Sequence, residues 1–244
     1  MVTSSPVWAS RYAELFGALA LAACVPEGPP TPEEPALPPE EADAGEQDPP
    51  LAEPFRDDFE RVDVGPEWRA LAPVWGIEAG ALCGEGARNR GIWLRRRLPH
   101  AVRVEVDAIA VSEEADLKIE LFGDGRSGAT KATYDDATGY VAIFGGWRNS
   151  MHVLARLDEH GSDRLALELS ATAEDPRAQP VRPGNRYRFK FERKQGNIVS
   201  WFVDGRLLLQ LDDKRPLTGA AHDHFALNDW NARVCFDNIE VTPL

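Results

Sequence analysis

Several motifs that mark well-known enzyme classes are missing from this sequence of 244 residues. It has no Gly-x-Ser-x-Gly elbow and no phosphate-binding loop, which argues against an α/β-hydrolase and against a P-loop nucleotide site. No cysteine and histidine spacing is typical of zinc, since only His222 and His224 lie close together. The sequence therefore has to be interpreted from less specific features.

A net positive charge is also absent. The formal net charge is −13, and residues 26–54 carry −9 of it, with ten prolines, nine acidic residues and no Lys or Arg. Residues 55–244 carry −4, with 26 basic and 30 acidic residues. This larger segment lacks the net basic charge of a nucleic-acid-binding domain, so we expect no nucleic-acid partner.

The N-terminal residues have the pattern of an exported protein. An apolar stretch at residues 15–23 is too short to span a bilayer, which needs about 20 apolar residues. It ends in Leu-Ala-Ala-Cys24, which resembles the lipobox of bacterial lipoproteins. The resemblance implies a signal peptide over residues 1–23, lipidation of Cys24 and membrane attachment in the bacterial cell envelope. Val25 favours the outer membrane, and the alternative is a cytosolic N-terminus with an unrelated cysteine.

Residues 24–54 predict a disordered tether after the lipidated cysteine. A Pro-rich, acidic segment buries too little apolar surface to offset the entropy of ordering it. Proline and like-charge repulsion both favour an extended chain, and at about 3.1 Å per residue the tether reaches at most about 90 Å.

Residues 55–244 predict one all-β domain, since short alternating or apolar runs are separated by Gly, Asp, Asn and Pro. Asp204-Gly205, between residues 198–203 and 206–211, is the clearest hairpin signal. About a dozen strands of this length indicate a two-sheet antiparallel sandwich. The other expected strands are residues 75–82 (two short strands), 102–111, 117–122, 140–144, 151–157, 164–170, 187–192 and 232–241.

Four segments resemble concanavalin A-like jelly rolls. They are FRDDFE at 55–60 followed by Trp68, WGIEAGAL at 75–82, NRYRF at 185–189 followed by GNIVSWFVDG at 196–205, and FDNIEV at 236–241. The closest members are the laminin-G-like domains and the 3-keto-disaccharide hydrolase-like domains. The resemblance implies a jelly-roll sandwich, and it says little about function because one fold hosts many functions.

Two cysteines lie within the predicted domain. Cys83 ends an early strand and Cys235 lies in the last one. Because jelly rolls place their first and last strands side by side, the resemblance makes a disulfide geometrically feasible. Closing a loop of about 150 residues would stabilise the fold by roughly 5 kcal/mol in the chain-entropy model. The alternative is two separately buried thiols, since free cysteine is among the most buried residue types.

A glycosidase motif is incomplete. Retaining glycosidases of this fold carry E-x-D-x-x-E, which places nucleophile and acid about 5 Å apart on one strand face. Residues 105–110 read E-V-D-A-I-A, so Glu105 and Asp107 share a face but the third carboxylate is absent. We interpret this pair, and the pair Lys118 and Glu120, as solvent-facing polar stripes. No catalytic residue is assigned, and the interpretation leans away from an enzyme.

Two loops predict a carbohydrate site, because sugar sites stack an aromatic ring on the sugar and surround it with planar polar groups. Trp147 follows two glycines at an expected turn, and Trp230 stands among amides and a carboxylate. By contrast, Trp75, Trp93 and Trp201 lie in alternating runs and predict core positions. The predicted carbohydrate-binding residues are Tyr140, Trp147, Arg148, His152, Asn228 and Trp230.

A structural calcium is the one cofactor expected. In the laminarinase-like relatives a calcium lies on the convex face, held by an Asp of the terminal strand and by carbonyls near an early glycine. By this resemblance Asp237 and Gly80 match those ligands, and Asp58 lies in a first strand that should neighbour the last. Calcium needs six to eight oxygen ligands, and the sequence names only these.

The leading hypothesis is an envelope-anchored lipoprotein whose β-sandwich binds a polysaccharide or glycoconjugate without cleaving it. The alternative is a glycoside-cleaving enzyme resembling the 3-keto-disaccharide hydrolases, which requires a carboxylate cluster in the cleft near Glu105, Asp116 or Glu120. The third is a structural or protein-interaction domain, which predicts that Trp147 and Trp230 are buried.

Overall fold

A computed structural model describes residues 47–244. The predicted signal peptide, Cys24 and most of the predicted tether lie outside the described residues. Within the described part of the chain, no helix is long and apolar enough to cross a membrane.

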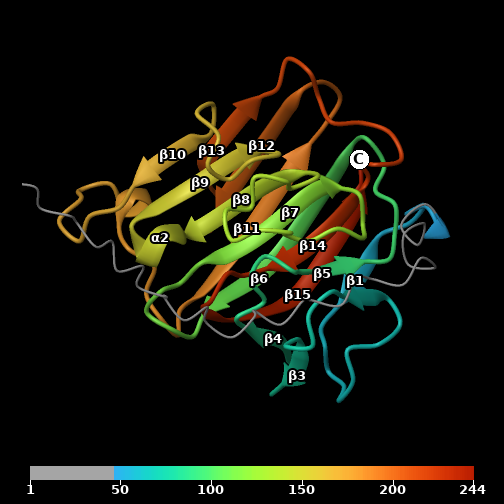
Figure 1. The fold of residues 1–244 in the computed structure, drawn as a ribbon, viewed down its shortest axis with the longest axis horizontal. Helices are drawn as coiled ribbons and strands as arrows, with labels where there is room; N and C mark the ends of the chain where they lie inside the picture. Colours follow the sequence, from blue (N-terminus) through green and yellow to red (C-terminus); the bar gives the residue numbers. More distant parts are fainter. Residues whose placement is uncertain (1–46) are drawn as a thin grey trace, which may run out of the picture. The chain divides into compact units, whose positions relative to one another are not determined.

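The described chain folds into two antiparallel sheets, which overlap in the view of Figure 1. One sheet has eight strands, in the order β13 (Arg206–Asp212), β12 (Ile198–Val203), β11 (Arg186–Arg193), β6 (Val102–Ala110), β15 (Arg233–Pro243), β4 (Ala81–Glu85) and β3 (Gly76–Glu78), with β1 (Phe55–Asp57) also paired to β15. The other has seven, in the order β10 (Leu165–Glu168), β9 (Met151–Arg156), β8 (Tyr140–Gly145), β7 (Leu117–Gly123), β14 (His224–Asn228), β5 (Ile92–Leu94) and β2 (Trp68–Ala70). The predicted two-sheet sandwich is confirmed.

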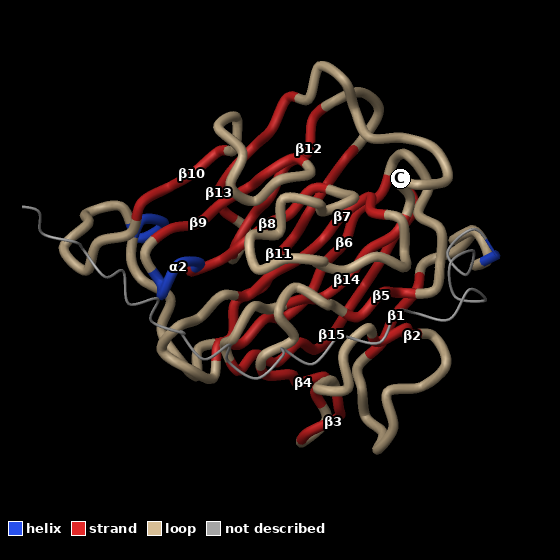
Figure 2. The backbone as a smooth tube through the Cα atoms, in the orientation of Figure 1, coloured by secondary structure: helices blue, strands red, loops and turns tan. Residues whose placement is uncertain are grey.

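Alternating sequence produces the layers. In β6 every second residue is buried, so Val104 and Val106 point into the space between the sheets. Leu117 and Ile119 of β7 point into the same core from the other sheet. A pleated strand sends successive side chains to opposite faces, so one period-2 pattern supplies a core face and an outer face. Figure 2 shows that strands and loops make up nearly all of the described chain.

The three tryptophans assigned to the core are buried. Trp75 is 8% exposed, and Trp93 and Trp201 are fully buried. Trp201 packs against Phe191 with ring centroids 5.4 Å apart. The prediction is confirmed for all three, although Trp93 is covered by a loop and does not lie between the sheets, because its neighbours Ile92 and Leu94 occupy that core.

The domain begins before the predicted boundary at residue 55. Asp48 is buried, and its carboxylate accepts hydrogen bonds from Arg69 at 2.9 Å and Arg95 at 3.4 Å. The backbone of Leu51 donates to Arg97 at 2.8 Å. Residues 48–51 therefore belong to the folded domain and not to a tether. The composition of this segment did not predict that it is folded, because the arginines that bind Asp48 lie 20 to 50 residues further along the chain.

A disulfide joins β4 to β15 in the structure. Cys83 and Cys235 face each other across the two paired strands, with an S–S distance of 2.03 Å. The disulfide therefore connects an early strand and the last strand of the chain, which are neighbours in the sheet. Of the two alternatives that the sequence left open, the structure contains the bonded pair.

Candidate functional site

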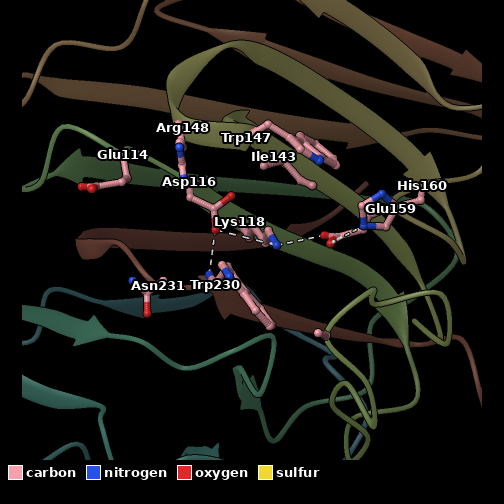
Figure 3. A pocket seen from close by; sticks show the side chains of 11 residues that line it. Glu114, Asp116, Lys118, Ile143, Trp147, Arg148, Glu159, His160, Trp230 and Asn231 are labelled. Carbon is pink, nitrogen blue, oxygen red and sulfur yellow. Dashed lines mark hydrogen bonds and ion pairs between the residues drawn. The ribbon is translucent and has the colours of Figure 1, made fainter.

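The outer face of the seven-stranded sheet carries a pocket of about 550 Å³. Its walls come from the segment before β7, the loop between β7 and β8, the turn after β8, the loop after β9 and the loop between β14 and β15, and side chains of β7 and β8 complete it. The lining residues are Glu114, Asp116, Lys118, Ala132, Ile143, Trp147, Arg148, Glu159, His160, Trp230 and Asn231. Figure 3 shows Lys118 between Trp147 on one side and Trp230 on the other.

The turn that carries Trp147 has an unusual backbone. In the short element α2 (Gly146–Asn149), Trp147 has φ 50° and Arg148 has φ 59°, both in the left-handed region. Such conformations cost about 1–3 kcal/mol each for ordinary residues and persist only when the surroundings fix them. The Asn149 side chain supplies this constraint, since it accepts from the Val181 N–H at 2.8 Å and donates to the Val181 carbonyl at 2.7 Å. The hydrogen bonds of Asn149 therefore fix the turn that places Trp147 at the pocket.

Both pocket tryptophans are half-buried, and each has an arginine beside its ring. The Arg164 guanidinium lies 4.7 Å from the Trp147 ring centroid, and the Arg88 guanidinium lies 5.5 Å from that of Trp230. Cation–π contacts of this kind fix the orientation of an indole ring. The structure therefore presents two oriented aromatic surfaces on opposite sides of one pocket.

The pocket floor is a buried ion cluster centred on Lys118. Its Nζ donates to Asn89 Oδ1 at 2.5 Å and to Glu159 Oε2 at 2.9 Å, and lies 3.7 Å from Asp116 Oδ2. The same Asp116 oxygen accepts the backbone N–H of Trp230 at 2.7 Å. This bond ties the Trp230 loop to the end of β7.

Burial dominates the electrostatics of the floor. It raises the pKa of Asp116, against the opposing effect of Lys118. Burial acts to lower the pKa of Lys118, but the charges of Asp116 and Glu159 outweigh it and the pKa is raised. Lys118 is therefore protonated and positively charged at neutral pH. Asp116 holds a proton more readily than an ordinary aspartate does.

A second buried group of polar residues adjoins the pocket along the same face. Glu120 accepts from the Tyr134 hydroxyl and from Asn228 Nδ2, each at 2.6 Å. Burial raises the pKa of Glu120 to about 7, against these two hydrogen bonds. Burial also raises the pKa of Asp229 to about 7, although Asp229 accepts from the Ala87 backbone.

The structure divides the predicted carbohydrate-binding residues into two groups. Trp147, Arg148 and Trp230 line one pocket, although they lie some 80 residues apart in sequence. Tyr140, His152 and Asn228 are buried and do not line it. Their prediction as exposed sugar ligands does not fit this structure.

The three buried residues have other partners. The Tyr140 hydroxyl donates to Asp213 at 2.7 Å. The His152 ring stacks on Phe144 with centroids 4.1 Å apart, and burial lowers the pKa of His152 to about 3. The Asn228 side-chain amide donates a hydrogen bond to Glu120. Tyr140 and His152 point into the core between the two sheets, whereas Asn228 lies on the outer face of its sheet. Local sequence does not show which face of a strand is buried.

The three carboxylates expected in one cleft, Glu105, Asp116 and Glu120, lie in different places. Asp116 lines the pocket and Glu120 lies in the adjoining cluster. Glu105 and Asp107 lie on the outer face of the eight-stranded sheet, where Arg186 and Arg188 pair with Asp107. Glu105 is therefore excluded from this pocket, and Lys118 and Glu120 are buried rather than solvent-facing.

The residues expected to bind calcium are engaged with other groups. Asp237 accepts from Arg186 at 2.9 Å, and Asp58 is exposed and accepts from the Glu60 backbone. An added Cβ at Gly80 would meet the Glu60 carboxylate at 2.7 Å. Within residues 47–244, no group of three or more His, Cys, Asp or Glu side chains is placed to hold a metal ion. Calcium needs six to eight oxygen ligands, and the expected site includes backbone carbonyls near Gly80, so calcium binding stays a prediction.

Comparisons with known proteins identify the fold. No protein-family model and no curated protein sequence matches the chain. The carbohydrate-binding module CBM66 from Bacillus subtilis is similar with a TM-score of 0.52 and 15% identity, over 72% of this chain and 95% of that one. The β-glucanase of Bacillus licheniformis has a TM-score of 0.51 and 10% identity, over 79% and 99%. The carbohydrate recognition domain of Emp47p has a TM-score of 0.54 and 12% identity, over 78% and 94%. At these identities the likeness shows the fold alone, which is a concanavalin A-like jelly roll.

Proposed function

We propose that the domain binds a glycan, and that the pocket between Trp147 and Trp230 is its binding site. The observation that carries the proposal is the meeting of two oriented tryptophans from distant loops over one polar floor. An indole face packs against the C–H face of a sugar ring, while charged and amide groups bond its hydroxyls. Asp116, Arg148 and Asn231 supply such groups around the pocket.

Two further points support binding. A pocket of about 550 Å³ falls within the range of ligand sites, and it combines apolar walls with a few polar groups. Structurally similar proteins include a carbohydrate-binding module and a carbohydrate recognition domain. The third hypothesis, a purely structural domain, predicted fully buried tryptophans, whereas both are half-buried at a pocket.

The test is a glycan array with the purified full chain, followed by calorimetry on the glycans retained. Trp147→Ala and Trp230→Ala should each weaken binding at least tenfold, since burying a large apolar side chain contributes about 1.5–3 kcal/mol. Phe202→Ala is the matched control. Phe202 is a half-buried aromatic under Lys190 on the other sheet, and its loss should leave binding unchanged. Binding that ignores both tryptophan changes would refute this site.

Glycoside cleavage is the second candidate, and one observation favours it. Asp116 lines the pocket with a raised pKa, as a general acid requires. Release of reducing sugar from a bound glycan, lost in Asp116→Asn while binding persists, would establish an enzyme. Unaltered glycan after long incubation would leave binding as the function.

Attachment to the cell envelope through Cys24 completes the proposal. Support comes from the lipobox-like run and the acidic, Pro-rich segment after it. Metabolic labelling with a fatty acid should mark the wild-type protein and not Cys24→Ser, and the variant should leave the membrane fraction. Equal fractionation of the two proteins would contradict the anchor.

A further inference from the structure

The loop formed by residues 124–139 covers part of the outer face of the seven-stranded sheet. In Figure 1 this loop, between β7 and β8, crosses in front of both strands. Its buried residues Tyr134 and Ala137 form a small hydrophobic cluster with Val141 and Ile143 of β8. Trp147 of the pocket packs against the same cluster, so the loop and the pocket share a wall.

Polar groups lie beneath and beside this loop where a sheet face would usually be apolar. Lys118, Glu120 and Asn228 point to the same side of β7 and β14, and each is at most 2% exposed. Asn89 and Asp229 are fully buried next to them, and each has one polar side-chain atom without a partner in the described structure. Burying such groups costs free energy unless they are fully satisfied. Their composition suits a surface that is wet or ligand-bound for part of the time.

The central part of the loop is weakly attached. Residues 130–137 make two hydrogen bonds to the rest of the described chain, and both involve Tyr134. Its hydroxyl donates to Glu120, and its carbonyl accepts from the Glu159 backbone at 3.3 Å. The other hydrogen bonds of this segment are internal, such as those between Thr130 and Asp136. Few contacts of this kind are typical of segments that open locally.

We propose that residues 130–137, the central part of loop 124–139, form a lid latched by the Tyr134–Glu120 hydrogen bond, and that its opening extends the pocket along the polar row Lys118, Glu120 and Asn228. The row then forms a hydroxyl-binding floor beyond the two tryptophans. The use of this floor for a glycan rests on the proposed function, whereas the opening of the lid does not.

The latch should respond to pH. Glu120 is faced by Tyr134 and Asp124 of the loop region, by Lys118 of its own strand and by Asn228 of β14. Burial under the loop keeps its pKa near 7, and exposure to water would return it towards 4.5. The closed lid therefore holds a proton that the open lid releases. Opening becomes more favourable as pH rises from about 5 to 7, by at most tenfold per pH unit.

Cysteine labelling tests the lid directly. Val141 lies under the loop, while the next residue, Ala142, points into the core between the sheets, and both are fully buried. Val141→Cys and Ala142→Cys, each made in the full chain with Cys24→Ser, are exposed to an aromatic disulfide reagent. We expect Val141→Cys to react at least tenfold faster, because the lid opens without unfolding of the core.

Removal of the latch supplies the second arm. Tyr134→Phe should raise the Val141→Cys rate a further tenfold and leave Ala142→Cys unchanged. The ratio of the Val141→Cys rate to the Ala142→Cys rate should rise between pH 5 and 7. In the Glu120→Gln background this ratio should not change with pH. Hydrogen exchange of residues 130–137 in the unaltered chain gives the same readout if a cysteine variant fails to fold. Equal rates at the two positions, or equal exchange in the loop and in β11, would overturn the lid even if the pocket binds a glycan.

Discussion

The outer faces of the two sheets are formed by strands with the same alternating pattern, but their polar side chains lie in different environments. On the eight-stranded sheet, Glu105 and Asp107 of β6 stay partly exposed and pair with arginines of β11. On the seven-stranded sheet, Lys118 and Glu120 of β7 alternate in the same way but are buried under loops. Alternation of polar residues therefore indicates which side chains point away from the core. Whether these side chains are exposed to solvent depends on the loops that cover the sheet.

The energetic consequence of this comparison is large. An exposed ion pair contributes about 0–1 kcal/mol because water screens it. A buried pair contributes little in total, but removing one partner leaves an uncompensated buried charge. The two faces should therefore respond very differently to the same substitution.

Removal of Lys118 should have the largest effect. Lys118→Ala leaves Glu159 and Asp116 buried without their cation, so the free energy of unfolding should fall by about 3–5 kcal/mol. Lys190→Ala is the control on the other sheet, where Lys190 is partly exposed beside Glu192, and should cost less than about 1 kcal/mol. Urea unfolding of both variants measures the difference, and similar losses would break the comparison.

The second-largest expected effect is the change in the free energy of unfolding with pH. The pKa of Glu120 is raised from 4.5 to about 7, so the folded state binds its proton more tightly than the unfolded chain. This contribution is full below about pH 4.5 and is lost as pH rises through 7, at up to about 1.4 kcal/mol per pH unit. His152, with its pKa lowered to about 3, acts in the opposite direction between about pH 3 and 6.5.

A difference measurement isolates the Glu120 contribution. The unfolding free energy of Glu120→Gln minus that of the wild type, followed from pH 5 to 8, should rise with pH. Burial acts to raise the pKa of Glu192, but the hydrogen bond from Arg103 and nearby cations outweigh it and the pKa is lowered, so the same subtraction with Glu192→Gln should be flat over this range. A flat difference for both variants would show that Glu120 is hydrated in solution.

The smallest effect is expected at Arg186, which pairs with Asp107 and Asp237 but is half exposed. Arg186→Ala should lower the free energy of unfolding by about 1 kcal/mol or less, and added salt should reduce the loss. Thermal melts at low and high salt measure it. A loss as large as that of Lys118→Ala would mean that the outer face of the eight-stranded sheet is covered as well.

The strands were predictable wherever one face is polar. Residues 102–110 alternate along their whole length, and Asp204-Gly205 marks the turn between β12 and β13. Strand β14 (His224–Asn228) was missed because only Phe225 and Leu227 form its apolar face, and Asn228 was assigned to a polar loop. An alternation of five residues is too short to distinguish a strand from a loop.

The predictable residues of the site were its two tryptophans, Arg148 and Asp116. Gly145-Gly146 and the amides around Trp230 signalled loops, and both rings line the pocket. The ion cluster of Lys118 was not recognised, since its partner Glu159 lies 41 residues further along the chain. The sequence of β7 does not show that a loop returns to cover it.

The disulfide between Cys83 and Cys235 has a consequence for the fate of a damaged molecule. All of the residues that line the pocket, and the whole of loop 124–139, lie between these two cysteines in sequence. A protease that cuts this loop therefore cannot release either fragment, because the bond still connects the segments before and after the cut. The nicked domain would keep its mass on a non-reducing gel and separate into two pieces only after reduction.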